Sequence, residues 1–223
     1  MTDVSRRPDD GSRPDGSLPT LYPIVDVDLC AMRSLDPLAV AKACLDGGAR
    51  LIQVRQKGNA EGSGALLALI RDVVAAAHSC EARVIVNDRC DMALMSTADG
   101  VHLGQQDLPA TVARRLLGGA RLVGVSTHTP EQVEEALIGP ADYIAVGPVF
   151  RTNTKDTGYT ARGLDLVRHA SGRGKPVVAI GGITLATAHE ILAAGAASVA
   201  IISDLLEGGE VAARVRAYLA AYG

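Results

Sequence analysis

The stretch RVIVNDRCDMALMSTADGVHLGQQD, residues 83–107, contains two short apolar runs, and polar residues follow each of them. The first run, 83–87, leads into Asp88, and the second, 100–103, leads into a polar segment that ends at Asp107. We interpret both runs as buried β-strands and the apolar segment that begins near Cys90 as a helix between them. Two strands joined through a helix form a βαβ unit, in which the strands are parallel.

The same alternation extends along the chain. Further apolar runs lie at 21–26, 50–54, 121–125, 142–146, 176–180 and 198–202. Helical patterns lie between most of the runs, at 37–45, 65–77, 130–137, 164–170, 186–194 and 211–222. Eight strand signals in roughly 200 residues predict an α/β fold, a single (β/α)₈ TIM barrel. A doubly wound sheet is the alternative, but no Gly-x-Gly-x-x-Gly segment follows the first run.

The beginning of the chain has a different composition. Residues 1–18 are rich in Pro, Gly, Asp, Arg and Ser and are almost free of apolar residues. Such a segment cannot bury enough apolar surface to offset the entropy lost on folding. We therefore expect a disordered N-terminal leader over 1–18 and one catalytic barrel domain over 19–223.

The amino-acid composition disfavours several classes of binding partner. Aromatic residues make up only 3% of the chain, which disfavours a surface that stacks nucleic-acid bases, and the net charge of −3 disfavours a surface that coats a polyanion. No apolar stretch reaches the roughly 18 residues of a membrane helix. The four cysteines form no C-x-x-C pair, and no signal peptide is visible. We expect free thiols in a cytoplasmic protein that binds small molecules, neither nucleic acid nor membrane, and the oligomeric state stays open.

The strand ends carry the residues that suggest chemistry. Asp88 and Asp107 could share a divalent cation, and Arg55, Lys57 and Lys155 could hold an anion, which together predict a Mg²⁺-assisted diphosphate site. Each residue also has a structural interpretation. The two bases that follow the run 50–54 could form a solvated pair, Asp88 could cap a helix, and Asp107 could begin a turn.

Two other features have alternatives as well. His102 lies on an apolar strand, where a histidine is more often a hydrogen-bonded core residue than a catalyst. Gly181 and Gly182 could form a tight strand–helix turn, but barrels commonly bind phosphate on main-chain amides in the loop after strand seven. Ser203, which follows the eighth run, would complete such a phosphate site.

These segments form an ordered set of motifs. The set comprises Gln-x-Arg-x-Lys at 53–57, Asn-Asp at 87–88, His-x-Gly-Gln-x-Asp at 102–107, Gly-Val-Ser-x-His-Thr at 124–129, Thr-x-Thr-Lys at 152–155, Gly-Gly-Ile at 181–183 and Ser203. In this order the motifs resemble those of the thiamine-phosphate synthase family, over about residues 21–206. The resemblance implies a TIM barrel that joins hydroxymethylpyrimidine diphosphate to thiazole phosphate, which releases pyrophosphate and gives thiamine phosphate.

The resemblance also implies a role for each matched residue. Asp88 and Asp107 would hold Mg²⁺, and Arg55, Lys57, Ser126 and Lys155 would be catalytic. The pyrimidine diphosphate would contact Gln53, Val54, Arg55, Gln56, Lys57, Asn87, Ser126 and Lys155. The thiazole phosphate would contact Thr152, Asn153, Thr154, Gly182, Ile202 and Ser203. The mechanism needs no protein nucleophile, because a diphosphate neutralised by cations can leave from a stabilised pyrimidine methylene carbocation.

The sequence departs from the family pattern at three places. Gln56 stands where the family usually has an acid, Arg151 replaces a usual Pro, and the segment 156–159 is only partly typical. Two rival functions remain open. A related thiazole tautomerase would need the phosphate site and could use His128 as acid or base. A non-catalytic barrel that binds thiamine phosphate would hold the product without turnover.

Overall fold

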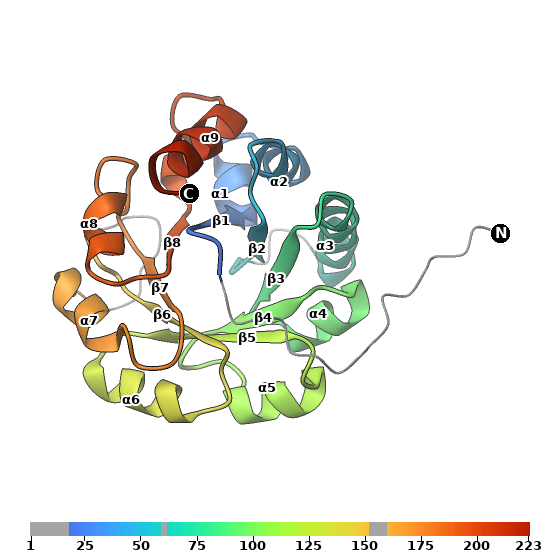
Figure 1. The fold of residues 1–223 in the computed structure, drawn as a ribbon. Helices are drawn as coiled ribbons and strands as arrows, with labels where there is room; N and C mark the ends of the chain where they lie inside the picture. Colours follow the sequence, from blue (N-terminus) through green and yellow to red (C-terminus); the bar gives the residue numbers. More distant parts are fainter. Residues whose placement is uncertain (1–17, 59–61, 152–159) are drawn as a thin grey trace.

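The computed structural model describes residues 18–58, 62–151 and 160–223, and within them eight parallel strands form a closed barrel. Each strand pairs with the next, and β8 pairs with β1 to close the ring (Figure 1). The strands are β1 Leu21–Asp26, β2 Leu51–Arg55, β3 Arg83–Asn87, β4 Gly100–Leu103, β5 Leu122–Thr127, β6 Tyr143–Val146, β7 Val177–Ile180 and β8 Ser198–Ile201. The predicted barrel is therefore confirmed, including the short fourth strand. The predicted leader lies outside the described residues apart from its last position, Leu18.

Helices surround the barrel. They are α1 Val27–Met32, α2 Pro37–Asp46, α3 Ser63–His78, α4 Cys90–Ser96, α5 Ala110–Leu117, α6 Pro130–Ile138, α7 Gly163–Ala170, α8 Ala188–Ala193, the 3₁₀ helix η1 Ser203–Leu206 and α9 Val211–Tyr222. The sequence pattern did not include α1, α5 or η1. None of the described helices is long and apolar enough to cross a membrane.

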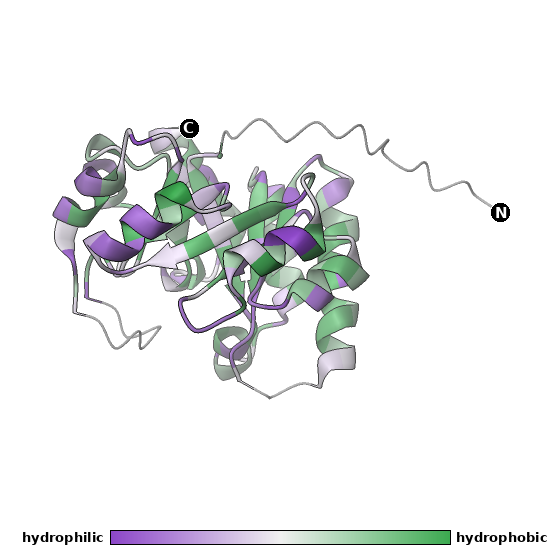
Figure 2. Ribbon diagram, turned by 90° about the horizontal axis from the view of Figure 1, so that it is seen from below, coloured by the Kyte–Doolittle hydropathy of each residue, from purple (hydrophilic) through white to green (hydrophobic). Residues whose placement is uncertain are grey.

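Two separate apolar layers stabilise the fold. One lies between the sheet and the helices, and the other fills the barrel interior with side chains that alternate along the strands. In Figure 2 the strands are mostly green, whereas the surrounding helices carry purple segments. The inner layer contains Tyr22, Ile24, Leu51, Ile85, Leu122, Tyr143, Ala145, Val178 and Ala200.

The cysteines are free thiols, as expected, and Cys30, Cys44 and Cys90 are buried whereas Cys80 is partly exposed. Burial raises the pKa of the Cys30 thiol to about 11 and that of Cys44 to about 12. These two thiols therefore stay protonated near neutral pH and behave as small apolar groups.

A glycine inside the barrel makes room for a tyrosine. Gly124 on β5 is in register with His102 on β4 and with Tyr143 on β6. A Cβ atom at Gly124 would overlap the ring of Tyr143. The missing side chain allows this ring to stack on His102, with 5.7 Å between ring centroids and 21° between ring planes.

We expect Gly124→Ala to destabilise the protein by about 1–3 kcal/mol, because the added methyl group forces the Tyr143 ring out of its packed position. The measurement is the free energy of unfolding in urea. The matched control is Gly64→Ala in α3, where a Cβ meets no atom within 4 Å. This control should be neutral or stabilising by about 0.5–1 kcal/mol. Equal stability of the two variants would contradict the packing described for Tyr143.

Candidate active site

The carboxyl ends of the strands surround a cavity at the barrel mouth. Its lining is polar toward strands β2 to β5 and apolar toward β6 to β8. The lining residues are Tyr22, Ile24, Gln53, Arg55, Asn87, His102, Ser126, Ala145, Val178, Ile180, Ala200 and Ile202. Five residues predicted for ligand contact are thus brought together here, namely Gln53, Arg55, Asn87, Ser126 and Ile202.

Arg55 enters this cavity as half of a buried ion pair. Its guanidinium contacts the carboxylate of Asp26, and the two residues are only 8% and 5% exposed. Asp26 also accepts a hydrogen bond of 2.9 Å from the Leu29 amide and so caps α1. Arg55 is therefore not a solvated base but a cation held in one place. Sequence reasoning did not single out Asp26, although its position at the end of β1 was the available signal.

Lys57 lies just beyond β2 and reaches toward β3 and β4. Its ammonium contacts the Asp88 carboxylate and lies 4.0 Å from the Asp107 carboxylate. Its main-chain amide, together with that of Gly58, donates to the Asp28 carboxylate at 2.8 and 2.9 Å. Asp28, also missed from the sequence, therefore fixes the loop that carries Lys57.

Asp88 has an unusual backbone. Its φ angle is 61°, in the left-handed region that few residues other than Gly, Asn and Asp adopt. Its carboxylate accepts a bond of 2.5 Å from the Asn87 side chain. Burial and the neighbouring Asp107 carboxyl raise the pKa of Asp88. The helix-cap interpretation does not hold, because the N-cap residue of α4 is Arg89 and no side chain caps that helix.

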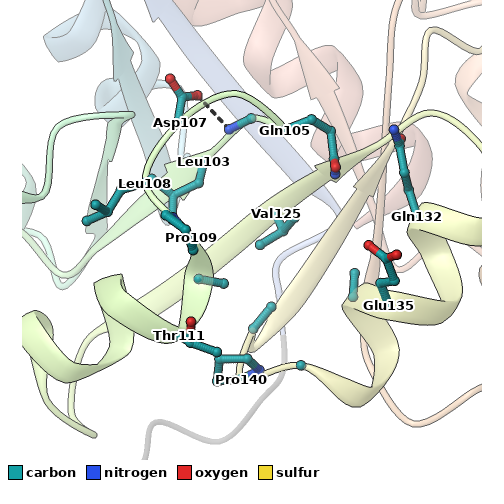
Figure 3. Close-up of a pocket in the computed structure, with 15 residues that line it drawn as sticks. Leu103, Gln105, Asp107, Leu108, Pro109, Thr111, Val125, Gln132, Glu135 and Pro140 are labelled. Carbon is teal, nitrogen blue, oxygen red and sulfur yellow. Dashed lines mark hydrogen bonds between the residues drawn. The ribbon is translucent and has the colours of Figure 1, made fainter.

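Asp107 has two functions in the fold. Its carboxylate accepts a 2.7 Å hydrogen bond from the Gly104 amide, which closes the turn after β4 (Figure 3). The same carboxylate faces Lys57. Asp107 is therefore a turn residue, but it ends the turn that starts at Gly104 and does not begin one, and this turn places the second acid beside the first.

His102 is the hydrogen-bonded core residue that the structural interpretation describes. Its Nδ1 lies 3.2 Å from the Tyr143 hydroxyl, and its Nε2 lies 2.8 Å from the Ser126 hydroxyl. The Gln105 side chain donates to the Ser126 carbonyl at 2.6 Å. Ser126 is thus held at both its side chain and its main chain.

The predicted phosphate segment lies partly within the described residues. Gly181 and Gly182 have positive φ angles, 103° and 65°. The Gly181 carbonyl accepts a hydrogen bond from the Phe150 amide at 3.0 Å, so the loop after β7 supports the loop after β6. Ile202 and Ser203 follow β8 directly. The predicted ligands Thr152, Asn153, Thr154 and Lys155 lie outside the described residues.

Two residues of the segment 53–57, Val54 and Gln56, are not among the residues that line the cavity. The Val54 side chain belongs to the outer apolar layer, between the sheet and the helices. Only its main chain could therefore contact a ligand in the barrel mouth. Gln56 is half-buried just after β2.

A second hollow lies outside the barrel, between α5 and α6. This groove of about 320 Å³ is lined by both apolar and acidic side chains, including Pro109, Val125 and Glu135 (Figure 3). Asp107 is at its edge, and no Lys or Arg is among the described residues that line it. An anionic ligand therefore suits the barrel mouth and not this groove.

His128 has a fixed ring. Its Nδ1 donates to the Gly147 carbonyl, with 2.5 Å between the two atoms, and the residue is buried at the end of β5. Any acid–base role of this histidine would therefore fall to Nε2.

Comparison with known proteins places this geometry in a family. The sequence profile of thiamine monophosphate synthase matches residues 21–205. The chain is 42% identical over 182 residues to a thiamine-phosphate synthase of Methanospirillum hungatei, an alignment that covers 81% of this chain and 87% of the relative. It is 45% identical over 186 residues to that of Anaeromyxobacter dehalogenans, with 82% of each chain covered.

A solved structure agrees with these sequences. The thiamine phosphate pyrophosphorylase of Pyrococcus furiosus superposes with a TM-score of 0.79 at 27% identity, and the match covers 92% of this chain and 98% of the other. The chain therefore belongs to the thiamine monophosphate synthase family of transferase enzymes.

Proposed function

We propose that the chain transfers the hydroxymethylpyrimidine group from its diphosphate to thiazole phosphate, which gives thiamine phosphate and pyrophosphate. The observation that carries the proposal is the gathering of Lys57, Asp88 and Asp107 at the rim of the cavity that Arg55 enters. Family membership supplies the substrates, since the relatives are named for this product. We further propose a cytoplasmic enzyme that acts on these two small molecules.

The reaction requires positive charge where the diphosphate departs. The bond between the pyrimidine methylene carbon and the diphosphate oxygen breaks, and its electron pair leaves with pyrophosphate. The lone pair of the thiazole nitrogen then forms the new bond to that carbon. Arg55 and Lys57, with Lys155 by family resemblance, would stabilise the negative charge that develops on the leaving group. Holding both substrates in one cavity would further increase the rate, because it places the two reacting atoms close together.

The acids at the rim suit a magnesium ion. Burial and the neighbouring Asp107 carboxyl raise the pKa of Asp88, and a divalent cation would stabilise the two ionised carboxylates there. Mg²⁺ usually takes one or two carboxylates and completes its coordination with phosphate oxygens and water. Asp88 and Asp107 would hold the ion, which when bound would neutralise charge on the diphosphate. Lys57, which contacts Asp88 in this structure, would then be free to turn toward the substrate.

The remaining contacts divide between the two substrates. Gln53, Asn87 and Ser126 present polar groups to the cavity and would bind the pyrimidine diphosphate, together with the main chain near Val54 and Gln56. The amide of Gly182 and the residues Ile202 and Ser203, on the opposite side of the mouth, would bind the thiazole phosphate. Thr152, Asn153 and Thr154 join this second group by family resemblance.

Incubation of the purified protein with both substrates and Mg²⁺ tests the proposal. We expect thiamine phosphate and pyrophosphate to appear in equal amounts, and neither when one substrate is left out. Isomerisation of thiazole phosphate alone would indicate the tautomerase instead. Tight binding of thiamine phosphate without any turnover would indicate a non-catalytic barrel.

We expect Asp88→Asn and Asp107→Asn each to slow turnover by orders of magnitude and to raise the Mg²⁺ concentration required, because each removes one carboxylate ligand. Asn tolerates the left-handed backbone at position 88, so the variant should fold. The measurement is turnover against Mg²⁺ concentration, with excess chelator as the zero point. Full activity of the unmodified protein in chelator would disprove the metal assignment.

We expect Asp26→Asn to raise the KM for the pyrimidine diphosphate and to lower stability by about 3–5 kcal/mol, because it leaves the buried Arg55 charge without its partner. Steady-state kinetics and urea unfolding are the measurements. The control is Asp165→Asn, which removes an exposed ion pair with Arg168. Such pairs contribute about 0–1 kcal/mol, so this variant should resemble the unmodified protein. An Asp26→Asn protein with unchanged KM would show that Arg55 does not need Asp26.

A further inference from the structure

A continuous chain of hydrogen bonds crosses the barrel interior along the lining of the cavity. The Gln53 amide nitrogen donates to the Tyr22 hydroxyl at 3.0 Å, and this hydroxyl lies 3.1 Å from that of Tyr143. Tyr143 lies 3.2 Å from Nδ1 of His102, whose Nε2 lies 2.8 Å from the Ser126 hydroxyl. Five side chains from five different strands are thus linked, and both end residues line the cavity.

The two tyrosines in the middle of the chain are almost fully buried. Tyr22 and Tyr143 are each 1% exposed, and Tyr143 is not among the residues that line the cavity. Burial raises the pKa of both tyrosines well above its ordinary value, so both keep their protons. Each hydroxyl therefore has one proton that needs an acceptor among its neighbours.

Counting these protons sets the direction of the chain. Tyr22 accepts from Gln53, and among the described residues the Tyr143 oxygen is the remaining partner for its own proton. The Tyr143 proton then goes to Nδ1 of His102, which leaves the His102 proton on Nε2. Nε2 in turn donates to Ser126. The Ser126 hydroxyl has then accepted one bond, and its own proton remains to be donated to a ligand in the cavity that Ser126 lines.

We infer that His102 is a positioning residue that Tyr143 holds in the Nε2–H tautomer, so that the Ser126 hydroxyl must donate to the substrate. This inference rests on the proposed function, because Ser126 is assigned there to the pyrimidine diphosphate. The atom that Ser126 meets must then be a hydrogen-bond acceptor, such as a diphosphate oxygen. The substrate binds to a donor that is already oriented, which avoids the cost of ordering it.

The packing around Gly124 supports the inference independently. Gly124 lies in register between His102 and Tyr143, and a side chain there would overlap the Tyr143 ring and hydroxyl. The barrel therefore leaves space at this position for a tyrosine that reaches the histidine. The two rings stack, which also fixes the plane of the imidazole.

The tautomer can be measured directly. Long-range ¹H–¹⁵N spectra at neutral pH resolve the ring nitrogens of the five histidines, and His102→Gln identifies the signals of His102. We expect the Nε2–H tautomer in the unmodified protein and a population of the Nδ1–H tautomer in Tyr143→Phe. The control Tyr218→Phe removes a buried hydroxyl that donates to Asp204 and should leave His102 unchanged. An Nδ1–H tautomer in the unmodified protein, or no change in Tyr143→Phe, would overturn the inference.

Kinetics test the link to Ser126. We expect Ser126→Ala to lower kcat/KM for the pyrimidine diphosphate roughly 10- to 150-fold, the usual effect of losing a hydrogen bond to a charged group. Tyr143→Phe should lower the same constant by less and leave the KM for thiazole phosphate unchanged. In the Ser126→Ala background, Tyr143→Phe should have no further effect beyond about twofold. Two results would show that Tyr143 is only structural. One is that the effects of the two substitutions on kcat/KM multiply in the double variant, and the other is that Tyr143→Phe weakens the binding of both substrates equally.

The two measurements separate this inference from the proposed function. Absence of turnover in the unmodified protein would overturn the proposed function, whereas the tautomer of His102 is read without substrate. Normal turnover with the wrong tautomer would overturn only the positioning role.

Discussion

A polar side chain inside a closed barrel must find its partner in the protein, because the packed interior holds other side chains where water would otherwise be. The inner layer of this barrel meets that requirement in two ways. Arg55 pairs with Asp26, and Gln53 begins the hydrogen-bonded chain that ends at Ser126. These partnerships fix the positions and the donor or acceptor character of the groups that face the cavity. The floor of the candidate active site is therefore set by the folding requirement itself.

Polar groups at the rim of the cavity do not need a partner within the protein, because water reaches them. Lys57 is about half-exposed, yet it is drawn to Asp88 and Asp107, whose carboxylates would otherwise repel each other. Asp88 also has a left-handed backbone, a conformation that residues other than glycine seldom adopt and that is often found at functional sites. Under the proposed function, a metal ion and a diphosphate would replace the attraction that Lys57 supplies here. Under that proposal, the rim would exchange one set of charges for another.

The sequence predicted the barrel well, because strands buried on both faces read as apolar runs whatever their neighbours are. It also placed the acids and bases at the strand ends, since that position follows from the runs. It missed the contributions of Asp26, Asp28, Tyr22 and Tyr143. Their roles depend on which residues of neighbouring strands lie side by side, and register across a barrel is not visible in one segment. The role of Gly124 could not be predicted for the same reason, because this glycine leaves space for the ring of Tyr143, which lies on the next strand.

Gln56 illustrates how one substitution acts through the charge of the whole rim. The charged groups described around the mouth include the cations Arg55 and Lys57 and the carboxylates of Asp26, Asp28, Asp88 and Asp107, so two negative charges are in excess among them. Under the proposed function, a divalent cation bound there would cancel this excess. An acid at position 56, as in the family pattern that the sequence resembles, would add one negative charge again. The neutral Gln56 would therefore leave a metal-bound rim more attractive to a diphosphate, and this departure from the family pattern is compatible with the proposed reaction.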